Sequence, residues 1–332
     1  MIRSLVSACV GLVLIQGCQQ VVEESPVLPV EPSDLANATD VAPLRSISLF
    51  PASLKPVWAT VVDSSSLRYV SIAEPIEKSE ERAGAKILYS IKIDSLAQLE
   101  ELLALLKKRK GQVAAPIAIP NALSNVPVRR KKKLFFSVLQ PIVSFHNSVL
   151  EDRRRRLMQL IDQGDLKADD RLFVAEMSQR YRIEAGVSYR DTLLELREKI
   201  GLIPPSLVLA QAAIESGWGS SRFCREGNNL FGQRVWSKKV DGLAPQGVQG
   251  ARFRLAVFPT ISASIRSYIH NLNTHPAYES LRTLRKDLRQ RGEPIDGHTL
   301  AGGLVAYSTR GEDYVEDVRR LMDSNNLERL DR

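Results

Sequence analysis

Glu215 is the residue whose setting most favours catalysis. It stands in the stretch AQAAIESGWGSSRFCREGNNLFG, directly after the segment SLVLAQAAIES and before a Gly-Trp-Gly turn. That segment is apolar on nearly every side and therefore predicts a buried helix, with Ser206 as its N-cap and Gly217 following its last residue. Burial disfavours a charged carboxylate, and the partial negative charge of a helix C-terminus acts in the same direction. We therefore expect a raised pKa at Glu215, as a general acid in glycoside cleavage requires.

The residues by themselves leave a plainer interpretation open. A glutamate at a helix end can cap the helix or pair with a cation, and Arg222 is close in the sequence. Other catalytic patterns are missing from the sequence: it has no H-E-x-x-H, no G-x-S-x-G and no phosphate-binding loop, and its four histidines lack metal-ligand spacing. We therefore expect neither a metal nor a cofactor.

Four segments of the sequence resemble the glucosaminidase family of peptidoglycan hydrolases, and in particular its Bax-type branch. E-S-G-W-G at residues 215–219 and N-N-L-F-G at residues 228–232 form a specific pair of motifs. FRLAVFPTISASIRSYIHNLNTHPAYESLR and LAGGLVAYSTRGEDYVEDV are similar to two later segments of that family. The resemblance covers about residues 128–325.

The resemblance implies a fold, an activity and a set of site residues. The fold is lysozyme-like and mainly helical, with a small β-flap beside a sugar-binding groove. The activity is hydrolysis of the β-1,4 bond between N-acetylglucosamine and N-acetylmuramic acid, without a metal, and Glu215 is the general acid. The groove wall and cleft comprise Trp218, Asn228, Asn229, Phe231 and Tyr307, of which Tyr307 is expected to hold an N-acetyl group or a water. Core packing is the alternative role for each aromatic residue.

The second catalytic group is less clear from the resemblance. Where the family has a second acid, it comes from the flap some 25–30 residues after the first. Asp241 is the acid in this flap and ranks first, although Asp-Gly is also a turn signal. Alternatives are Glu226, Glu312, Asp313, or the N-acetyl group of the substrate. The sequence also departs from the family: Arg310 stands in Y-S-T-R-G where many members read Y-A-T-D-P, and Cys224, Arg225 and Glu226 form an insertion.

The elements that must position these residues are mostly helical. One long helix, perturbed at Pro141, is expected in residues 135–161, and further helices follow before and after a flap in residues 230–258. We assign residues 128–332 to this domain and residues 114–127 to a linker. Residues 55–113 predict a small α/β module, with a strand in AKILYSIKI and a helix in which Ser95 and Gln98 have capping-box spacing. The fold class is therefore mainly α (α+β), with a small α/β module before a lysozyme-like domain.

The N-terminal residues resemble a bacterial lipoprotein signal. Arg3, a short apolar run and the ending I-Q-G-C predict a signal peptide in residues 1–17 and lipidation of Cys18. An ordinary signal peptide or a weak anchor is the alternative. Residues 18–54 are rich in proline, alanine and acids and predict a flexible tether. The protein is therefore expected on the periplasmic side of a Gram-negative bacterium, anchored by lipid, and Gln19 favours the outer membrane.

The positive charge of the chain lies in its C-terminal part. Residues 126–332 hold 34 lysines and arginines against 25 acids, and two basic runs are Arg129 to Lys133 and Arg153 to Arg156. Export argues against nucleic acid as a partner, so an acidic wall polymer or a membrane surface fits better, and a solvated helix face is the alternative. The expected partners are a peptidoglycan glycan strand and a bacterial membrane. The predicted function is a peptidoglycan glucosaminidase, and the alternative is a catalytically weak wall-binding lipoprotein.

Overall fold

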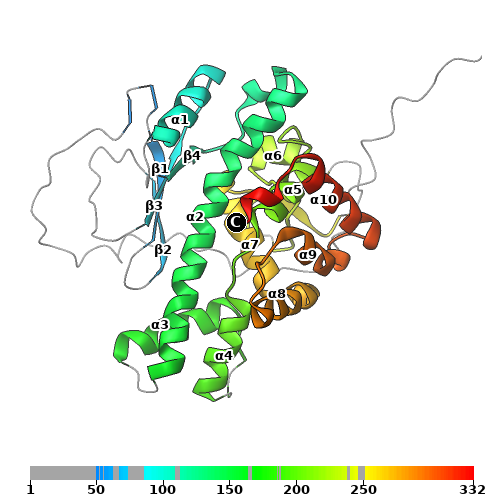
Figure 1. Cartoon of the computed structure of the whole chain (residues 1–332). Helices are drawn as coiled ribbons and strands as arrows, with labels where there is room; N and C mark the ends of the chain where they lie inside the picture. The colour runs from blue at the N-terminus through cyan, green and yellow to red at the C-terminus, as the bar shows by residue number, and fades with distance from the viewer. Residues whose placement is uncertain are drawn as a thin grey trace, which may run out of the picture.

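One long helix organises the fold. The computed structural model describes residues 50–332, except residues 52, 55, 63–66, 74–85, 109–112, 164–166, 185, 187, 238–239 and 246–250. The predicted signal peptide, Cys18 and nearly all of the predicted tether lie outside these residues. Helix α2 (Val128–Gln163) stands between a four-stranded sheet and most of the other helices (Figure 1). No helix of the described part has both the length and the apolar character needed to cross a membrane.

The sheet lies before α2 in the chain and contains one crossover helix. Its elements are β1 (Pro56–Val62), β2 (Tyr69–Ala73), β3 (Lys86–Ile91), α1 (Leu96–Lys108) and β4 (Val113–Pro116). The strand order is β2-β1-β3-β4, and only β3 and β4 are parallel. Parallel neighbours need a crossover, which α1 supplies. The predicted cap is confirmed, because the Gln98 N–H donates to Ser95 Oγ at 3.2 Å. Residues 114–116, at the start of the predicted linker, are part of β4.

The rest of the chain is helical apart from a small flap. Its helices are α2, α3 (Ala168–Arg180), α4 (Tyr189–Lys199), α5 (Pro205–Ser216), α6 (Arg222–Gly227), α7 (Ile261–Thr274), α8 (Glu279–Arg291), α9 (Gly297–Ala301) and α10 (Glu312–Ser324), with 3-10 turns η2 (Asn121–Asn125), η3 (Pro276–Tyr278), η4 (Gly302–Tyr307) and η5 (Glu328–Leu330). The flap contains β5 (Arg234–Val235), β6 (Gly242–Leu243) and β7 (Arg254–Ala256) in the order β5-β7-β6. The predicted mainly helical, lysozyme-like class with a β-flap is confirmed.

A shared core joins the sheet to the helices. Leu88 of β3, Phe135 and Leu139 of α2, and Leu207 of α5 are all fully buried and belong to one hydrophobic cluster. Pro141 lies inside α2 without ending it. Because α2 carries buried side chains toward both the sheet and α5, it fixes the position of α5 relative to the rest of the molecule.

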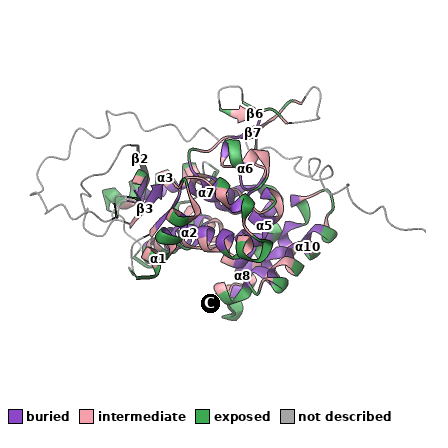
Figure 2. Cartoon of the chain, turned by 90° about the horizontal axis from the view of Figure 1, so that it is seen from above, coloured by how far each residue is buried: buried purple, intermediate pink, exposed green. Residues whose placement is uncertain are grey.

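Helix α5 is the most enclosed of these elements, and both of its ends are held. Residues 206–213 are all buried, as Figure 2 shows for the centre of the helical part. The helix begins at Pro205, so the prediction that Ser206 is the N-cap was wrong. Asp331 fills that role from 125 residues away: its carboxylate accepts the Ser206 N–H at 2.8 Å, the Ser206 hydroxyl at 2.5 Å and the Gly297 N–H at 2.9 Å. An anion at a helix N-terminus is stabilised by the helix dipole.

The C-terminal end of α5 turns sharply through three left-handed residues. Gly217, Trp218 and Gly219 have φ of 56°, 60° and 79°. The Trp218 N–H donates to Ala213 O at 3.0 Å and the Gly217 N–H to Ile214 O at 3.3 Å, which is a Schellman motif. Only glycine adopts this conformation without strain, so the two glycines flanking the tryptophan make the turn possible. The prediction that Gly217 follows the last helical residue is confirmed.

We predict that Gly219→Ala destabilises the protein by about 2 kcal/mol or more, because it combines left-handed strain with a clash. A Cβ at this position would lie 2.6 Å from Ile119 Cγ2. Gly292→Ala is the matched control, since its φ is 67° and no atom lies within 4 Å of the added Cβ. Denaturant unfolding of both variants measures the difference. If Gly219→Ala and Gly292→Ala lower the free energy of unfolding equally, the clash with Ile119 makes no contribution and the prediction is contradicted.

Candidate active site

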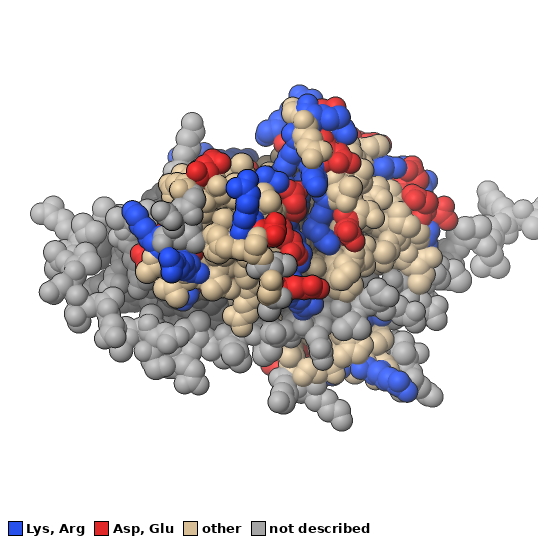
Figure 3. Space-filling model, turned by 90° about the horizontal axis from the view of Figure 1, so that it is seen from below, with Lys and Arg blue, Asp and Glu red and all other residues tan. Residues whose placement is uncertain are grey.

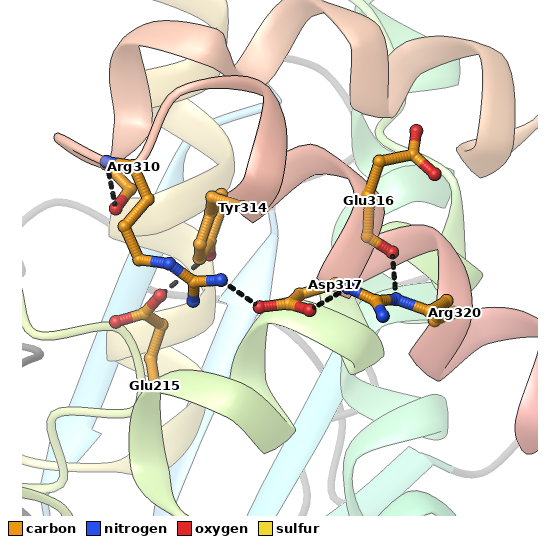
Figure 4. Close-up of polar contacts among 7 residues, drawn as sticks. Glu215, Arg310, Tyr314, Glu316, Asp317 and Arg320 are labelled. Atoms are coloured by element: carbon orange, nitrogen blue, oxygen red, sulfur yellow. Dashed lines mark hydrogen bonds and ion pairs between the residues drawn. The ribbon is translucent and has the colours of Figure 1, made fainter.

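Glu215 lies in the last turn of α5 and is held by one strong contact. Tyr314 of α10 donates its hydroxyl proton to Glu215 Oε1 at 2.7 Å (Figure 4). The other carboxyl oxygen makes no hydrogen bond within the described residues, and Glu215 is partly exposed. Burial raises the pKa of Glu215 to about 7, and the hydrogen bond from Tyr314 acts in the opposite direction. The carboxyl group is therefore partly protonated near neutral pH, with one oxygen open to a reactant.

A chain of donors points toward this carboxyl group. Tyr268 of α7 donates to Gln211 Oε1, Gln211 Nε2 donates to the Tyr314 hydroxyl at 3.0 Å, and Tyr314 donates to Glu215. Burial raises the pKa of both tyrosines well above the usual value, and the charge of Glu215 adds to this. Both phenols therefore stay protonated and remain donors. A chain polarised in one direction strengthens its last bond, so it stabilises the carboxylate that remains after Glu215 gives up its proton.

Stacked aromatic rings hold the donor chain in place. Tyr307 stacks on Tyr314 with ring centroids 5.4 Å apart, and Phe231 stacks on Tyr268 at 3.9 Å. The Tyr307 hydroxyl donates to Phe231 O at 3.1 Å and so ties η4 to the N-N-L-F-G segment. In this structure Tyr307 thus supports Tyr314 through its ring and the groove wall through its hydroxyl.

A hollow beside these rings could receive a sugar. It is partly open to solvent, and the space within it that the centre of a water molecule can reach is about 50 Å³. Its lining residues are Phe231, Gly232, Gln233, Arg234, Val235, Trp236, Ala256, Phe258, Ser267, Tyr268, Asn271, Tyr278 and Tyr307. Aromatic rings with a few polar groups are typical of small-molecule sites. Asn271 is among the lining residues, and its buried Oδ1 has no hydrogen-bond partner in the described residues.

The two asparagines of the N-N-L-F-G segment shape the backbone of the groove wall. Asn229 is buried, donates to Gln233 O and Ala256 O at 2.8 and 3.0 Å, and accepts the Gln233 N–H at 3.0 Å. Asn228 has a φ of 51° and donates to Phe258 O at 3.0 Å. Each amide group therefore connects the segment to the flap or to the approach to α7. Of the five motif residues in this segment, Phe231 and Gly232 line the hollow.

Trp218 packs on α2, away from the residues that line the hollow. Its ring makes edge contacts with Phe135 and Phe136 at centroid distances of 5.7 and 5.2 Å, and Lys132 Nζ lies 4.6 Å from the ring centroid. These contacts keep a bulky residue in the left-handed conformation that the turn after Glu215 needs.

The candidates for the second acid all lie at exposed positions. Asp241 precedes β6 in the flap, which projects from the body in Figure 2, and its side chain makes no hydrogen bond or ion pair with other described residues. Glu226 pairs with Arg222 at 2.9 Å. Glu312 and Asp313 are exposed in the first turn of α10. The structure therefore brings none of these four carboxylates into contact with Glu215.

The basic runs and the remaining cysteine have structural partners. Arg153 is buried and donates to Leu67 O at 2.6 Å, while Arg155 and Arg156 each pair with an aspartate at 3.0 Å. On the face shown in Figure 3, cations and acids are interspersed. Cys224 is buried and burial raises its pKa to about 12, which fits a packed residue rather than a nucleophile.

One group of side chains in the described part has the composition of a metal site. Atoms of His298, Asp323 and Glu328 that could each bind a metal lie within 4.8 Å of one another, and both acids are exposed. None of the three contributes to the donor chain that ends on Glu215 or to the lining of the hollow. The chemistry available at Glu215 therefore depends on the carboxyl group, the tyrosines and the hollow.

Comparisons with known proteins match the region that contains this site. Residues 190–327 match the glucosaminidase family, described as mannosyl-glycoprotein endo-beta-N-acetylglucosaminidase. Protein bax of Escherichia coli K12 is 32% identical to this chain over 185 residues, which cover 55% of this chain and 66% of that protein. Peptidoglycan hydrolase FlgJ of the same organism is 24% identical over 159 residues, covering 44% of this chain and 46% of FlgJ. FlgJ of Salmonella typhimurium is 26% identical over 162 residues, with the same coverage.

The sequence marks the acid but not the groups that control its pKa. Tyr314, Gln211 and Tyr268 were not assigned a role, although a signal for one of them exists. Gln211 is polar in an otherwise apolar helix and precedes Glu215 by four residues, which places both on one helix face. The two tyrosines come from helices distant in the sequence, and no local pattern marks them.

We predict that Glu215→Gln makes the protein more stable than the wild type at alkaline pH. Folded Glu215 has a pKa of about 7 against a usual value of 4.5, so between these pH values the folded state keeps a proton that the unfolded state releases. Wild-type stability therefore falls as pH rises through this window, by at most about 3 kcal/mol, and the glutamine variant avoids this loss. Urea unfolding at pH 4 and pH 8 measures the free energy of unfolding of the wild type and of Glu215→Gln. Asp241→Asn, at an exposed position, is the control. If the difference in the free energy of unfolding between Glu215→Gln and the wild type does not grow from pH 4 to pH 8, the raised pKa of Glu215 is contradicted.

We also predict that Tyr314→Phe raises the pKa of Glu215 further above 7, because the change removes the one hydrogen bond that stabilises its charged form. Titration of the glutamate carboxyl carbon by NMR measures the shift. Tyr307→Phe is the control, since it removes a hydroxyl from the neighbouring stacked ring that binds Phe231 O instead. Equal shifts in both variants would show that the Tyr314 hydroxyl has no special role.

Proposed function

The part of the chain that contains Glu215 belongs to the glucosaminidase family, as its motifs predicted, and on this basis we propose that the protein is an exported peptidoglycan hydrolase. The proposed reaction is cleavage of the β-1,4 bond between N-acetylglucosamine and N-acetylmuramic acid. The observation that carries the proposal is a carboxyl group with a pKa of about 7 at the end of a buried helix, beside an aromatic hollow. The name of FlgJ, a peptidoglycan hydrolase, supports the choice of polymer.

Glu215 acts as general acid in this proposal. Its open oxygen carries the proton to the glycosidic oxygen as the bond breaks, and general acid catalysis of this kind contributes about 10²- to 10⁴-fold. The carboxylate that remains is stabilised by the Tyr314 hydroxyl, which is itself polarised through Gln211 and Tyr268. Burial therefore keeps the proton on Glu215 before transfer, and the donor chain lowers the free energy of the charged group after it.

The hollow is the proposed site of a sugar adjoining the scissile bond. Phe231, Tyr268 and Tyr307 present ring surfaces, which suit the apolar faces of a sugar, and Asn271 Oδ1 offers an unused acceptor for an acetamido N–H or a hydroxyl. Tyr268 begins the donor chain and Tyr307 stacks on Tyr314, so these two lining residues connect the hollow to the partners of Glu215.

Export and anchoring belong to the same proposal. A signal peptide in residues 1–17, a lipid on Cys18 and a tether in residues 18–54 would let the domain reach the cell wall from a membrane. Metabolic labelling with a fatty acid checks the lipid, and the label should disappear in Cys18→Ser.

Product analysis tests the reaction. Purified protein is incubated with peptidoglycan, and the products are reduced with borohydride and identified by mass spectrometry. New reducing ends of N-acetylglucosamine are expected, and Glu215→Gln should reduce turnover by about three orders of magnitude while still binding. Reducing ends of N-acetylmuramic acid would indicate a muramidase instead, and 1,6-anhydro sugars a lytic transglycosylase. Full activity of Glu215→Gln would refute the mechanism.

A wall-binding protein with little catalysis is the second candidate function. It is favoured by the exposed position of Asp241, which makes no contact with Glu215 among the described residues. Cosedimentation with sacculi without release of soluble products would support it over the hydrolase.

We predict that Asp241→Asn lowers the turnover number at least about tenfold if the flap carries the second carboxylate to the substrate. Glu226→Gln is the matched control, because Glu226 is also exposed but is engaged by Arg222. Initial rates on purified glycan strands compare the two. A fully active Asp241→Asn would instead favour the N-acetyl group of the substrate as the nucleophile.

A further inference from the structure

Arg310 stands at the edge of the site without a role in the proposed reaction. It lies between η4, which carries Tyr307, and α10, which carries Tyr314. Its guanidinium Nη2 pairs with Asp317 at 2.5 Å, and its side chain is 40% exposed. In this loop the chain reads Y-S-T-R-G, where many members of the resembled family have an aspartate in place of the arginine.

The ion pair with Asp317 places the guanidinium over the catalytic face of α10. Tyr314 and Asp317 are three residues apart and so lie on one face of the helix. Arg310 pairs with Asp317 of this face, and Tyr314 of the same face binds Glu215 through its hydroxyl. Figure 4 shows Arg310 extending past the Glu215–Tyr314 pair toward Asp317. Arg310 is therefore an exposed cation on the side of α10 that carries Tyr314, the partner of Glu215.

The guanidinium has donors to spare. Asp317 takes one Nη2 donor, and Asp317 is also shared with Arg320, whose Nη2 lies 2.5 Å from its other oxygen. No side-chain bond of Arg310 Nε or Nη1 is formed with the described residues. A planar guanidinium with free donors on one edge is suited to a carboxylate, which it can bind through two parallel hydrogen bonds.

Asp317 also keeps this cation away from Glu215. The causes of the raised pKa at Glu215 are burial and the Tyr314 hydrogen bond, and Arg310 is not among them. A guanidinium bound directly to Glu215 would favour the carboxylate and remove the acid proton. Because Arg310 pairs with Asp317 and not with Glu215, it does not favour loss of the acid proton.

We propose that Arg310 binds a carboxylate of the glycan substrate beside the bond that Glu215 cleaves, and so favours muramic-acid-containing strands over neutral polymers of N-acetylglucosamine. This inference rests on the proposed function. The carboxylate has two possible sources with the same chemistry: the lactyl group of muramic acid in strands without peptides, and the acids of the stem peptide in strands that keep them. A carboxylate on the muramic acid side of the bond is the feature that distinguishes this polymer from chitin.

Affinity measurements separate this role from turnover. The background is Glu215→Gln, so that bound glycan is not cleaved. The probes are glycan strands freed of peptides by an amidase, the same strands with their lactyl carboxylates converted to methylamides, and strands that retain stem peptides. With Arg310 present, we expect at least one carboxylated strand to bind about fivefold more tightly than the neutral strand, a preference that weakens with salt.

The variants decide which residue causes the preference. Arg310→Gln should abolish the tighter binding of carboxylated strands, and Arg310→Lys should keep a part of it. Arg320→Gln is the matched control, because Arg320 pairs with the same aspartate but its side chain is 71% exposed on the far side. It should leave the preference unchanged. Thermal unfolding of each variant confirms that the fold is intact.

The outcomes are distinct. Tighter binding of the peptide-free strand than of its methylamide identifies the lactyl group as the source of the carboxylate. Tighter binding of the peptide-bearing strand alone identifies the stem peptide as the source. A preference that persists in Arg310→Gln, or equal binding of charged and neutral strands when Arg310 is present, overturns the proposal. If the wild-type protein releases no cleavage products, the proposed function is overturned instead. The ratio of affinities for charged and neutral strands is measured independently of cleavage.

Discussion

The hydrogen bond between Tyr314 and Glu215 is the interaction on which the site depends. Burial alone would keep the Glu215 carboxyl protonated and make its proton hard to give up, whereas a strong cationic partner would leave it ionised and without a proton to give. A neutral donor at 2.7 Å lies between these extremes. It opposes burial only in part, and the resulting pKa of about 7 allows the group to exchange its proton near neutral pH.

Much of the helical domain serves to keep this bond in place. Glu215 and Tyr314 are 99 residues apart in the sequence, so their helices must be positioned independently. Asp331 holds the first turn of α5, the Gly-Trp-Gly turn ends the helix at the acid, and the stack of Tyr307 on Tyr314 orients the phenol from the other side. Left-handed Trp218 is a strained residue, and its packing on Phe135 and Phe136 offsets that strain.

The sequence was sufficient for the local features and insufficient for the distant ones. The apolar run before Glu215 predicted its burial, the direction of its pKa and the glycine turn, because each depends on neighbouring residues. The flap and the helices followed from periodicity and from the family resemblance. The contacts of Tyr314, Gln211 and Asp331 could not be predicted, since each partner comes from another part of the chain. Ser206 has the residue type of an N-cap, but a carboxylate from the C-terminus occupies that role.

The structure divides the site into a rigid half and an exposed half. Glu215 and its donors lie on the most enclosed helix and on rings that stack at fixed distances, which suits a group whose proton affinity must be set within a narrow range. Asp241 and Arg310 lie on the flap and on a loop, where side chains reach solvent and can follow a polymer. In the proposed function the substrate is a glycan strand that varies in its peptides, so groups that contact it would need freedom that the acid must not have. Burial of the acid and exposure of its neighbours therefore both fit the proposed function, in which a single tuned carboxyl group acts on a bulky polymer.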